Sequence, residues 1–171
     1  MPIDIQTILV ATDFSEASEL ATTYAFRLAS ALRARLYLLH VVPEDDLRLI
    51  TSISQHLQSS ITPIALTDVF YTEAHKRLTQ LIAEAQASAV VHERLVVTGQ
   101  PAEAILSWAV AKQGQLIILG THGHRGLNRF LMGSVAERVV RQARCAVIVV
   151  PGEKIRFPTP SLSESAKRLA L

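Results

Sequence analysis

Cysteine is almost absent from this chain of 171 residues, which contains only Cys145. A single cysteine excludes an internal disulfide and any metal site built from several thiolates. Because Cys145 falls within the apolar run CAVIVVP, we expect a buried, inert thiol. The chain also lacks a Gly-Lys-Ser/Thr tripeptide and a Gly-x-Gly-x-x-Gly fingerprint after its first apolar run. These absences disfavour a P-loop and an ordinary NAD site.

Long apolar runs and a strong charge of one sign are missing as well. No run is long enough to span a bilayer, and the amino terminus MPIDIQTILVATDFS shows no signal-peptide pattern, so we expect a cytoplasmic protein without a membrane partner. The formal net charge is only +2, and the residues after Gly152 account for it. No concentrated basic face remains, which disfavours nucleic acid as a partner.

What is present is an alternation of strand-like and helix-like segments. Nearly continuous runs of Val, Ile and Leu predict strands within residues 5–11, 34–42, 93–99, 115–120 and 145–151. Apolar residues spaced three and four apart predict helices after Ser15, over 65–87, from Pro101 and over 135–143. The segment from Pro43 to Ile64 is less regular and is compatible with a short amphipathic helix.

Strands buried on both sides and separated by helices are typical of a parallel sheet covered on both faces. Right-handed crossovers then favour an α/β, doubly wound fold. We expect one domain over residues 1–151 and a weakly ordered tail over 152–171. Ligands of such folds bind at the carboxyl ends of the strands. If the first and fourth strands are neighbours, the Thr12-Asp13 turn and the loop after Gly120 open onto one crevice.

The loop GTHGHRGLNRFLMGS, residues 120–134, contains four of the seven glycines. Glycine lets a ligand approach the backbone without a Cβ in the way. The first amides of the following helix, at Ser134, Val135 and Ala136, have no acceptor within the helix and form an anion site. The Ser134 hydroxyl is available to a phosphate, to its own helix as a cap, or to both. A phosphate-bearing ligand is favoured over an ordinary surface turn.

Several motifs together make the chain similar to a known family. The spacing Gly-x2-Gly-x9-Gly-Ser, followed by VAERVVRQARCAVIVVP, resembles the ATP-binding segment of the universal stress protein family. ILVATDFSEAS and HVVP match that family too, and the resemblance covers roughly residues 3–151. It implies an open five-stranded parallel sheet of order 3-2-1-4-5, a Rossmann-like fold related to adenine nucleotide alpha hydrolases.

The resemblance also implies a binding site for ATP. Ala11, Thr12 and Asp13 would line the adenosine end, and the backbone of Val41 would contact the adenine edge. The residues implied around the ribose and phosphates are Gly120, His122, Gly123, Gly133, Ser134 and Val135.

Alternatives stay open at several of these positions. Asp13 suits ribose hydroxyls or the adenine amino group, but it also fits an Asx turn at the helix entry. Arg125 and Arg129 could pair with the distal phosphates or form a solvated face of the loop, and Mg²⁺ is another candidate for that space. We assign no catalytic residue and no metal ligand.

Three functions remain in competition: an ATP-binding regulatory module, a slow ATPase and a nucleotide-free interaction protein. Without a Walker lysine or a carboxylate pair beside the loop, fast phosphoryl transfer is disfavoured, so we favour the binding module. The last strand, Cys145 to Val150, would lie at a sheet edge and carries no charge. Such an edge favours a homodimer through paired strands, unless the tail covers it.

Overall fold

The predicted strands form one parallel sheet in a computed structural model that describes residues 4–56, 63–121 and 132–152. The strand order β3-β2-β1-β4-β5 confirms the order 3-2-1-4-5. The elements are β1 (Thr7–Ala11), α1 (Glu16–Leu32), β2 (Arg35–Pro43), α2 (Glu44–His56), α3 (Pro63–Glu84), β3 (Val91–Gly99), α4 (Pro101–Ala111), β4 (Leu116–Gly120), α5 (Ser134–Gln142) and β5 (Ala146–Val150).

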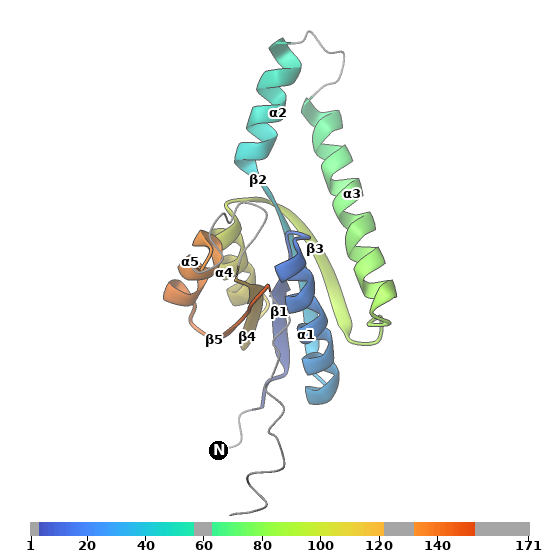
Figure 1. The fold of residues 1–171 in the computed structure, drawn as a ribbon, viewed down its shortest axis with the longest axis vertical. Helices are drawn as coiled ribbons and strands as arrows, with labels where there is room; N and C mark the ends of the chain where they lie inside the picture. Colours follow the sequence, from blue (N-terminus) through green and yellow to red (C-terminus); the bar gives the residue numbers. More distant parts are fainter. Residues whose placement is uncertain (1–3, 57–62, 122–131, 153–171) are drawn as a thin grey trace, which may run out of the picture.

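Each face of the sheet carries its own apolar core. On one face, Ile8 and Val10 of β1 pack with Ala25 of α1 and Leu78 of α3. On the opposite face, alternate residues of the same strands pack with α4 and α5 (Figure 1). Because successive side chains of a strand point to opposite faces, a strand covered on both sides must be apolar throughout. This requirement explains the unbroken Val, Ile and Leu runs.

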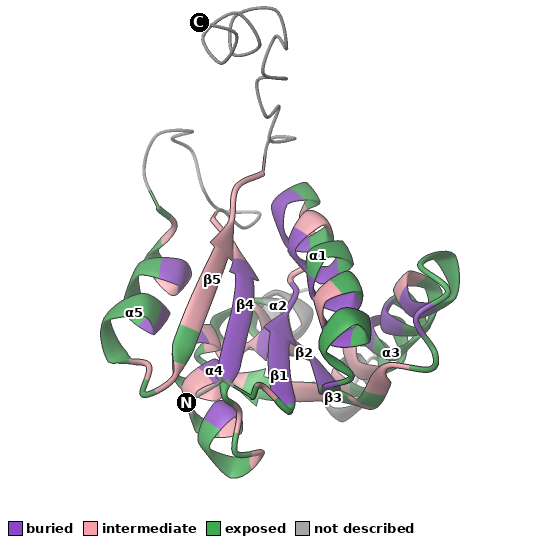
Figure 2. Cartoon of the chain, turned by 90° about the horizontal axis from the view of Figure 1, so that it is seen from below, coloured by how far each residue is buried: buried purple, intermediate pink, exposed green. Residues whose placement is uncertain are grey.

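Burial decreases from the centre of the sheet to its edges. All five residues of β1 are buried, and so are the first four of β4. Figure 2 shows these two strands in the middle of the sheet, with the less buried β5 beside β4. In β5, Ala146 is exposed and the other four residues are half-buried. The expectation that every strand is buried on both sides is therefore wrong for the edge strands, which lack one neighbour.

Helix α1 begins where the sequence predicts, because Ser15 caps it. The Ser15 side chain accepts a hydrogen bond from the N–H of Ser18, and Glu16 and Glu19 lie in the first turn, near the positive end of the helix dipole. The irregular segment after Pro43 forms α2, and Figure 1 shows α2 and α3 extending together beyond the carboxyl end of β2. No helix in the described ranges is long and apolar enough to cross a membrane.

Candidate functional site

The pairing of β1 with β4 brings two predicted site segments to the same edge of the sheet. The register places Val10 beside Ile118, so the turn after β1 and the residues after β4 leave the sheet as neighbours. The Thr12 N–H donates to the Leu39 carbonyl at 2.9 Å, and the Thr121 N–H donates to the Val150 carbonyl at 2.9 Å. Backbone hydrogen bonds to neighbouring strands therefore fix the first residue after β1 and the first residue after β4 at the carboxyl edge of the sheet.

Side-chain hydrogen bonds organise the turn between β1 and α1. Oδ1 of Asp13 accepts from the Ser15 N–H at 3.1 Å and from the Ser15 hydroxyl at 2.5 Å, which is an Asx turn. Oγ1 of the buried Thr12 accepts from the Phe14 N–H at 3.0 Å and lies 3.0 Å from the Ser18 hydroxyl oxygen. The Asx turn considered for Asp13 is therefore present, and its contact with a nucleotide stays a prediction.

Phe14 holds this turn in an unusual conformation. Its φ of 63° lies in the left-handed region, where a bulky side chain is strained. The buried ring packs against His40, with centroids 4.5 Å apart, and the guanidinium carbon of Arg77 lies 4.1 Å from the ring centroid. These contacts from β2 and α3 fix the ring and so stabilise the strained backbone.

His40 ties β2 to the same turn. Its Nδ1 lies 2.9 Å from the Thr12 carbonyl oxygen and donates to it. Burial lowers the pKa of His40 below its ordinary value, because the imidazolium loses hydration. The Thr12 carbonyl and the Asp13 carboxylate act in the opposite direction and do not outweigh burial, while Arg77 adds to the lowering. No sequence pattern indicated a role for His40, Phe14 or Arg77, since their contact arises only in the fold.

Ala11 and Val41 lie on the face covered by α4 and α5, and both side chains are buried. The register between β1 and β2 ends at Ala11 and Leu39, so Val41 extends past the last paired residue of β1. The Leu39 carbonyl faces β1, as its bond to Thr12 shows, and backbone polar groups of a strand repeat their direction every second residue. The backbone N–H and C=O of Val41 therefore face the space beyond the end of β1.

Gly120 has a packing role that the sequence did not indicate. A Cβ built on Gly120 would lie 2.8 Å from the backbone carbon of Ala17 and 2.9 Å from the backbone nitrogen of Ser18. Helix α1 thus packs directly against the end of β4, at a distance that excludes any side chain. A contact between Gly120 and a nucleotide stays a prediction.

The start of α5 differs in one respect from the prediction. Gly133 is the N-cap, in an extended conformation with φ −62° and ψ 149°, and Ser134 is the first helical residue. No side-chain bond caps this helix, so the interpretation of Ser134 as its cap is wrong. The Gly133 N–H donates to the Thr121 carbonyl at 2.7 Å, which joins the beginning of α5 to the end of β4. Val135 is half-buried and packs on the core under α4.

Three predicted contact residues, His122, Gly123 and Arg125, lie outside the described residues, as does Arg129. Among the described residues, no group of three His, Cys, Asp or Glu side chains is placed to hold a metal ion.

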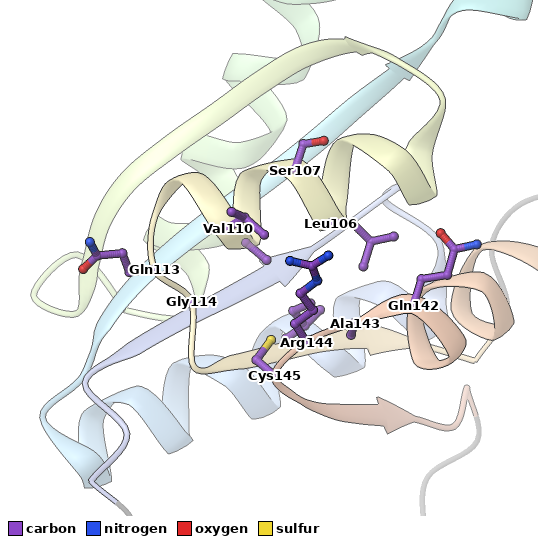
Figure 3. A pocket seen from close by; sticks show the side chains of 11 residues that line it. Leu106, Ser107, Val110, Gln113, Gly114, Gln142, Ala143, Arg144 and Cys145 are labelled. Carbon is purple, nitrogen blue, oxygen red and sulfur yellow. The ribbon is translucent and has the colours of Figure 1, made fainter.

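Cys145 is not the buried strand residue that the sequence predicts. It precedes β5 and is half-buried, and burial raises the pKa of its thiol. It lines a cavity of about 580 Å³ between α4 and the connection from α5 to β5 (Figure 3). This cavity lies near the amino ends of β4 and β5, at the edge of the sheet opposite the crevice predicted for the nucleotide.

A model of the universal stress protein family matches residues 4–151. The chain belongs to the universal stress protein family. Universal stress protein MJ0531 of Methanocaldococcus jannaschii is 31% identical over 147 residues, which cover 86% of this chain and 82% of that protein. The solved structure of universal stress protein UspA from Lactobacillus plantarum has 25% sequence identity and a TM-score of 0.71. The match covers 87% of this chain and 99% of the Lactobacillus plantarum chain.

Two further solved universal stress proteins share the fold and contain adenine nucleotides. One is in complex with cAMP, with 22% identity, a TM-score of 0.60 and coverage of 88% of this chain and 100% of that chain. The other, from Archaeoglobus fulgidus, is in complex with dAMP, with 22% identity, a TM-score of 0.57 and coverage of 86% and 99%. At this identity the likeness establishes the fold alone.

Proposed function

We propose that this universal stress protein is an ATP-binding regulatory module whose state depends on nucleotide occupancy. The proposal rests on one observation: the β1–α1 turn, the backbone of Val41 and the beginning of α5 meet at the carboxyl edge of the sheet. Such an edge is where doubly wound folds bind their ligands. The cAMP and dAMP complexes of proteins with the same fold agree with this choice of ligand class.

The adenosine half of the ligand would lie between the turn and β2. The Val41 N–H and C=O face the space past the end of β1, where they can donate to and accept from an adenine edge. The Asp13 carboxylate accepts hydrogen bonds when ionised, which suits ribose hydroxyls or the adenine amino group. Its Asx turn fixes the carboxylate within the turn between β1 and α1.

The phosphates would lie at the beginning of α5. The first turn of a helix presents amides without partners in the helix, and the dipole there favours negative charge. In α5 the first of these amides belong to Ser134, Val135 and Ala136, and the Glu137 N–H is bonded to the Gly133 carbonyl at 2.9 Å.

Mg²⁺ accompanying the distal phosphates belongs to the same proposal. A slow ATPase is the second candidate, since a bound triphosphate beside water hydrolyses at some rate even without a dedicated base.

Isothermal titration with ATP and AMP tests the site through Asp13→Asn. The amide keeps an oxygen at Oδ1 for the Ser15 N–H, so the turn is retained while the negative charge is lost. We expect ATP and AMP to weaken alike, by about 1–3 kcal/mol. Asp4→Asn, which removes a carboxylate before the start of β1, is the matched control and should bind normally. A loss confined to ATP would place Asp13 at the phosphates, and unchanged binding of both ligands would remove it from the site.

We also propose that the protein forms a homodimer through β5. This strand is the last in the sheet order, and among the described residues its outer edge has no neighbour. Its five residues, Ala146 to Val150, carry none of the charges that protect exposed edges. A second copy pairing antiparallel across a two-fold axis would cover both edges in a closed assembly.

A further inference from the structure

Both peptide units that flank Asp13 are held by hydrogen bonds. The Thr12 carbonyl, in the unit before Asp13, accepts from Nδ1 of His40 at 2.9 Å. The Phe14 N–H, in the unit after Asp13, donates to Oγ1 of Thr12 at 3.0 Å. Because peptide units are planar, the two soft dihedrals of Asp13 lie between two fixed planes. These bonds therefore restrict the direction in which the Asp13 side chain leaves the backbone.

The second of these units depends on Phe14, whose φ of 63° lies in the left-handed region. A bulky residue keeps such a φ only where its surroundings hold it there. The centroid of the buried Phe14 ring lies 4.5 Å from the centroid of the His40 ring and 4.1 Å from the guanidinium carbon of Arg77. Without these contacts Phe14 would relax towards a negative φ. The peptide unit that it shares with Asp13 would then rotate.

Arg77 approaches the turn from α3 and is not engaged elsewhere in the part of the chain that the structure describes. The residue is exposed, and within residues 4–56, 63–121 and 132–152 it takes part in no ion pair. A guanidinium over the face of an aromatic ring is attracted by the ring quadrupole. A substitution of Arg77 thus removes its contact with Phe14 without leaving a buried charge unpaired.

We propose that His40 and Arg77 are positioning residues of the nucleotide site, which direct the Asp13 carboxylate at the adenosine half of the ligand. His40 fixes the peptide unit before Asp13, and Arg77 fixes the Phe14 ring after it. The inference rests on the proposed nucleotide site and gives β2 and α3 a part in affinity that needs no contact with the ligand. Because Asp13 is the group that they direct, removing Arg77 should cost no more affinity than removing Asp13.

Isothermal titration of the full chain with ATP and with AMP tests the part played by Arg77. Arg77→Met keeps a long unbranched side chain but removes the charge over the ring. We expect both nucleotides to bind about two- to fivefold more weakly, as the usual strength of an exposed cation–π contact implies. Arg77→Lys keeps a cation at this place and should retain most of the affinity. Lys76→Met is the matched control and should bind like wild type, because Lys76 lies on the same helix and pairs with Glu73 at 3.9 Å.

A double-mutant cycle shows whether Arg77 acts through Asp13. In an Asp13→Ala background no carboxylate remains to be directed, so Arg77→Met should cause no further loss of affinity. An equal loss in both backgrounds would overturn the proposal, because Arg77 would then affect affinity independently of the carboxylate.

Two substitutions of His40 test its bond to the Thr12 carbonyl. An asparagine amide can take the place of Nδ1 and donate to that carbonyl, whereas leucine cannot donate. Both variants lose the imidazole ring beside Phe14, so His40→Asn should bind ATP and AMP more tightly than His40→Leu. Equal affinities of the two variants would show that the hydrogen bond has no part in positioning.

Thermal unfolding of each variant separates positioning from stability. If Arg77→Met lowers Tm but binds both nucleotides like wild type well below its Tm, the contact serves the fold alone and the proposal is overturned. If Asp13→Ala loses affinity while Arg77→Met and His40→Leu do not, the positioning fails and the nucleotide site stands. If wild-type protein binds neither ATP nor AMP, the nucleotide site and the positioning fail together.

Discussion

Replacing Gly120 by alanine should destabilise the folded protein even when no nucleotide is present. The new methyl group would lie 2.8 Å and 2.9 Å from the backbone carbon and oxygen of Ala17. These are main-chain atoms in the first turn of α1, so no side-chain rotation can relieve the contact. The helix must instead move away from β4, which weakens the packing around Ala21 and Ala25 on the same face.

Two opposing effects set the magnitude. Overpacking of this kind costs about 1–3 kcal/mol, and a contact with rigid backbone belongs to the upper part of that range. Alanine also restricts the unfolded chain, which returns about 0.4–1 kcal/mol because the φ of Gly120 is not in the left-handed region. The net loss is about 2 kcal/mol in the free energy of unfolding. For a chain of this length it should lower Tm by about 4–8 °C.

Thermal unfolding followed by circular dichroism measures the effect on nucleotide-free protein. Gly152→Ala is the control, because its methyl group would also approach Ala17 but would meet the Cβ of that residue at 3.1 Å. A side-chain methyl can give by a few tenths of an ångström, so a smaller decrease in Tm is expected. If Gly120→Ala melts like wild type and loses only ATP affinity, the residue serves the ligand, and the packing explanation is refuted.

Three further predictions concern His40, Phe14 and the β5 edge. Because the pKa of His40 is lowered in the folded protein, the unfolded chain binds more protons than the folded protein below about pH 6.5. The free energy of unfolding should therefore decrease as the pH is lowered below this value. His40→Gln should reduce this acid dependence in chemical denaturation at several pH values, and an unchanged dependence would contradict it. Phe14→Gly should be at least as stable in thermal unfolding as Phe14→Ala, since φ 63° strains alanine and not glycine; the reverse order would argue against strain at this position. Val149→Lys should shift the protein towards monomer in analytical ultracentrifugation, and an unchanged dimer would exclude β5 as the interface.

The succession of elements could be predicted from the residues themselves. Apolar runs placed the strands, and the Ser15 cap with its acidic first turn placed the start of α1. The order of the strands could not be predicted from periodicity. A run such as QLIILG indicates that a strand is buried, but it does not indicate which strand lies beside it. That order came from the family resemblance, and the pairing of Ile8 with Leu116 confirms it.

Contacts between segments that lie far apart in the chain could not be predicted from the sequence. Phe14, His40 and Arg77 come from a turn, a strand and a helix, and their stack exists only when the sheet brings these elements together. Cys145 was misjudged for a related reason. Its position in the apolar run CAVIVVP suggested a strand, but β5 begins one residue later and Cys145 lines the cavity beside α4.

The glycines of the motif show how one pattern combines two physical requirements. Packing against α1 is sufficient to explain Gly120. The backbone of Gly133 does not require a glycine, because its φ of −62° and ψ of 149° suit any residue. Serine or aspartate would cap α5 better, but their side chains would accept hydrogen bonds from the first amides of the helix. Those are the amides that the proposed site offers to phosphate, so a glycine at the N-cap keeps them available and lets the ligand approach the backbone. A glycine costs little stability as an N-cap, and it suits a phosphate site at α5 because it brings no side chain that competes for the amides.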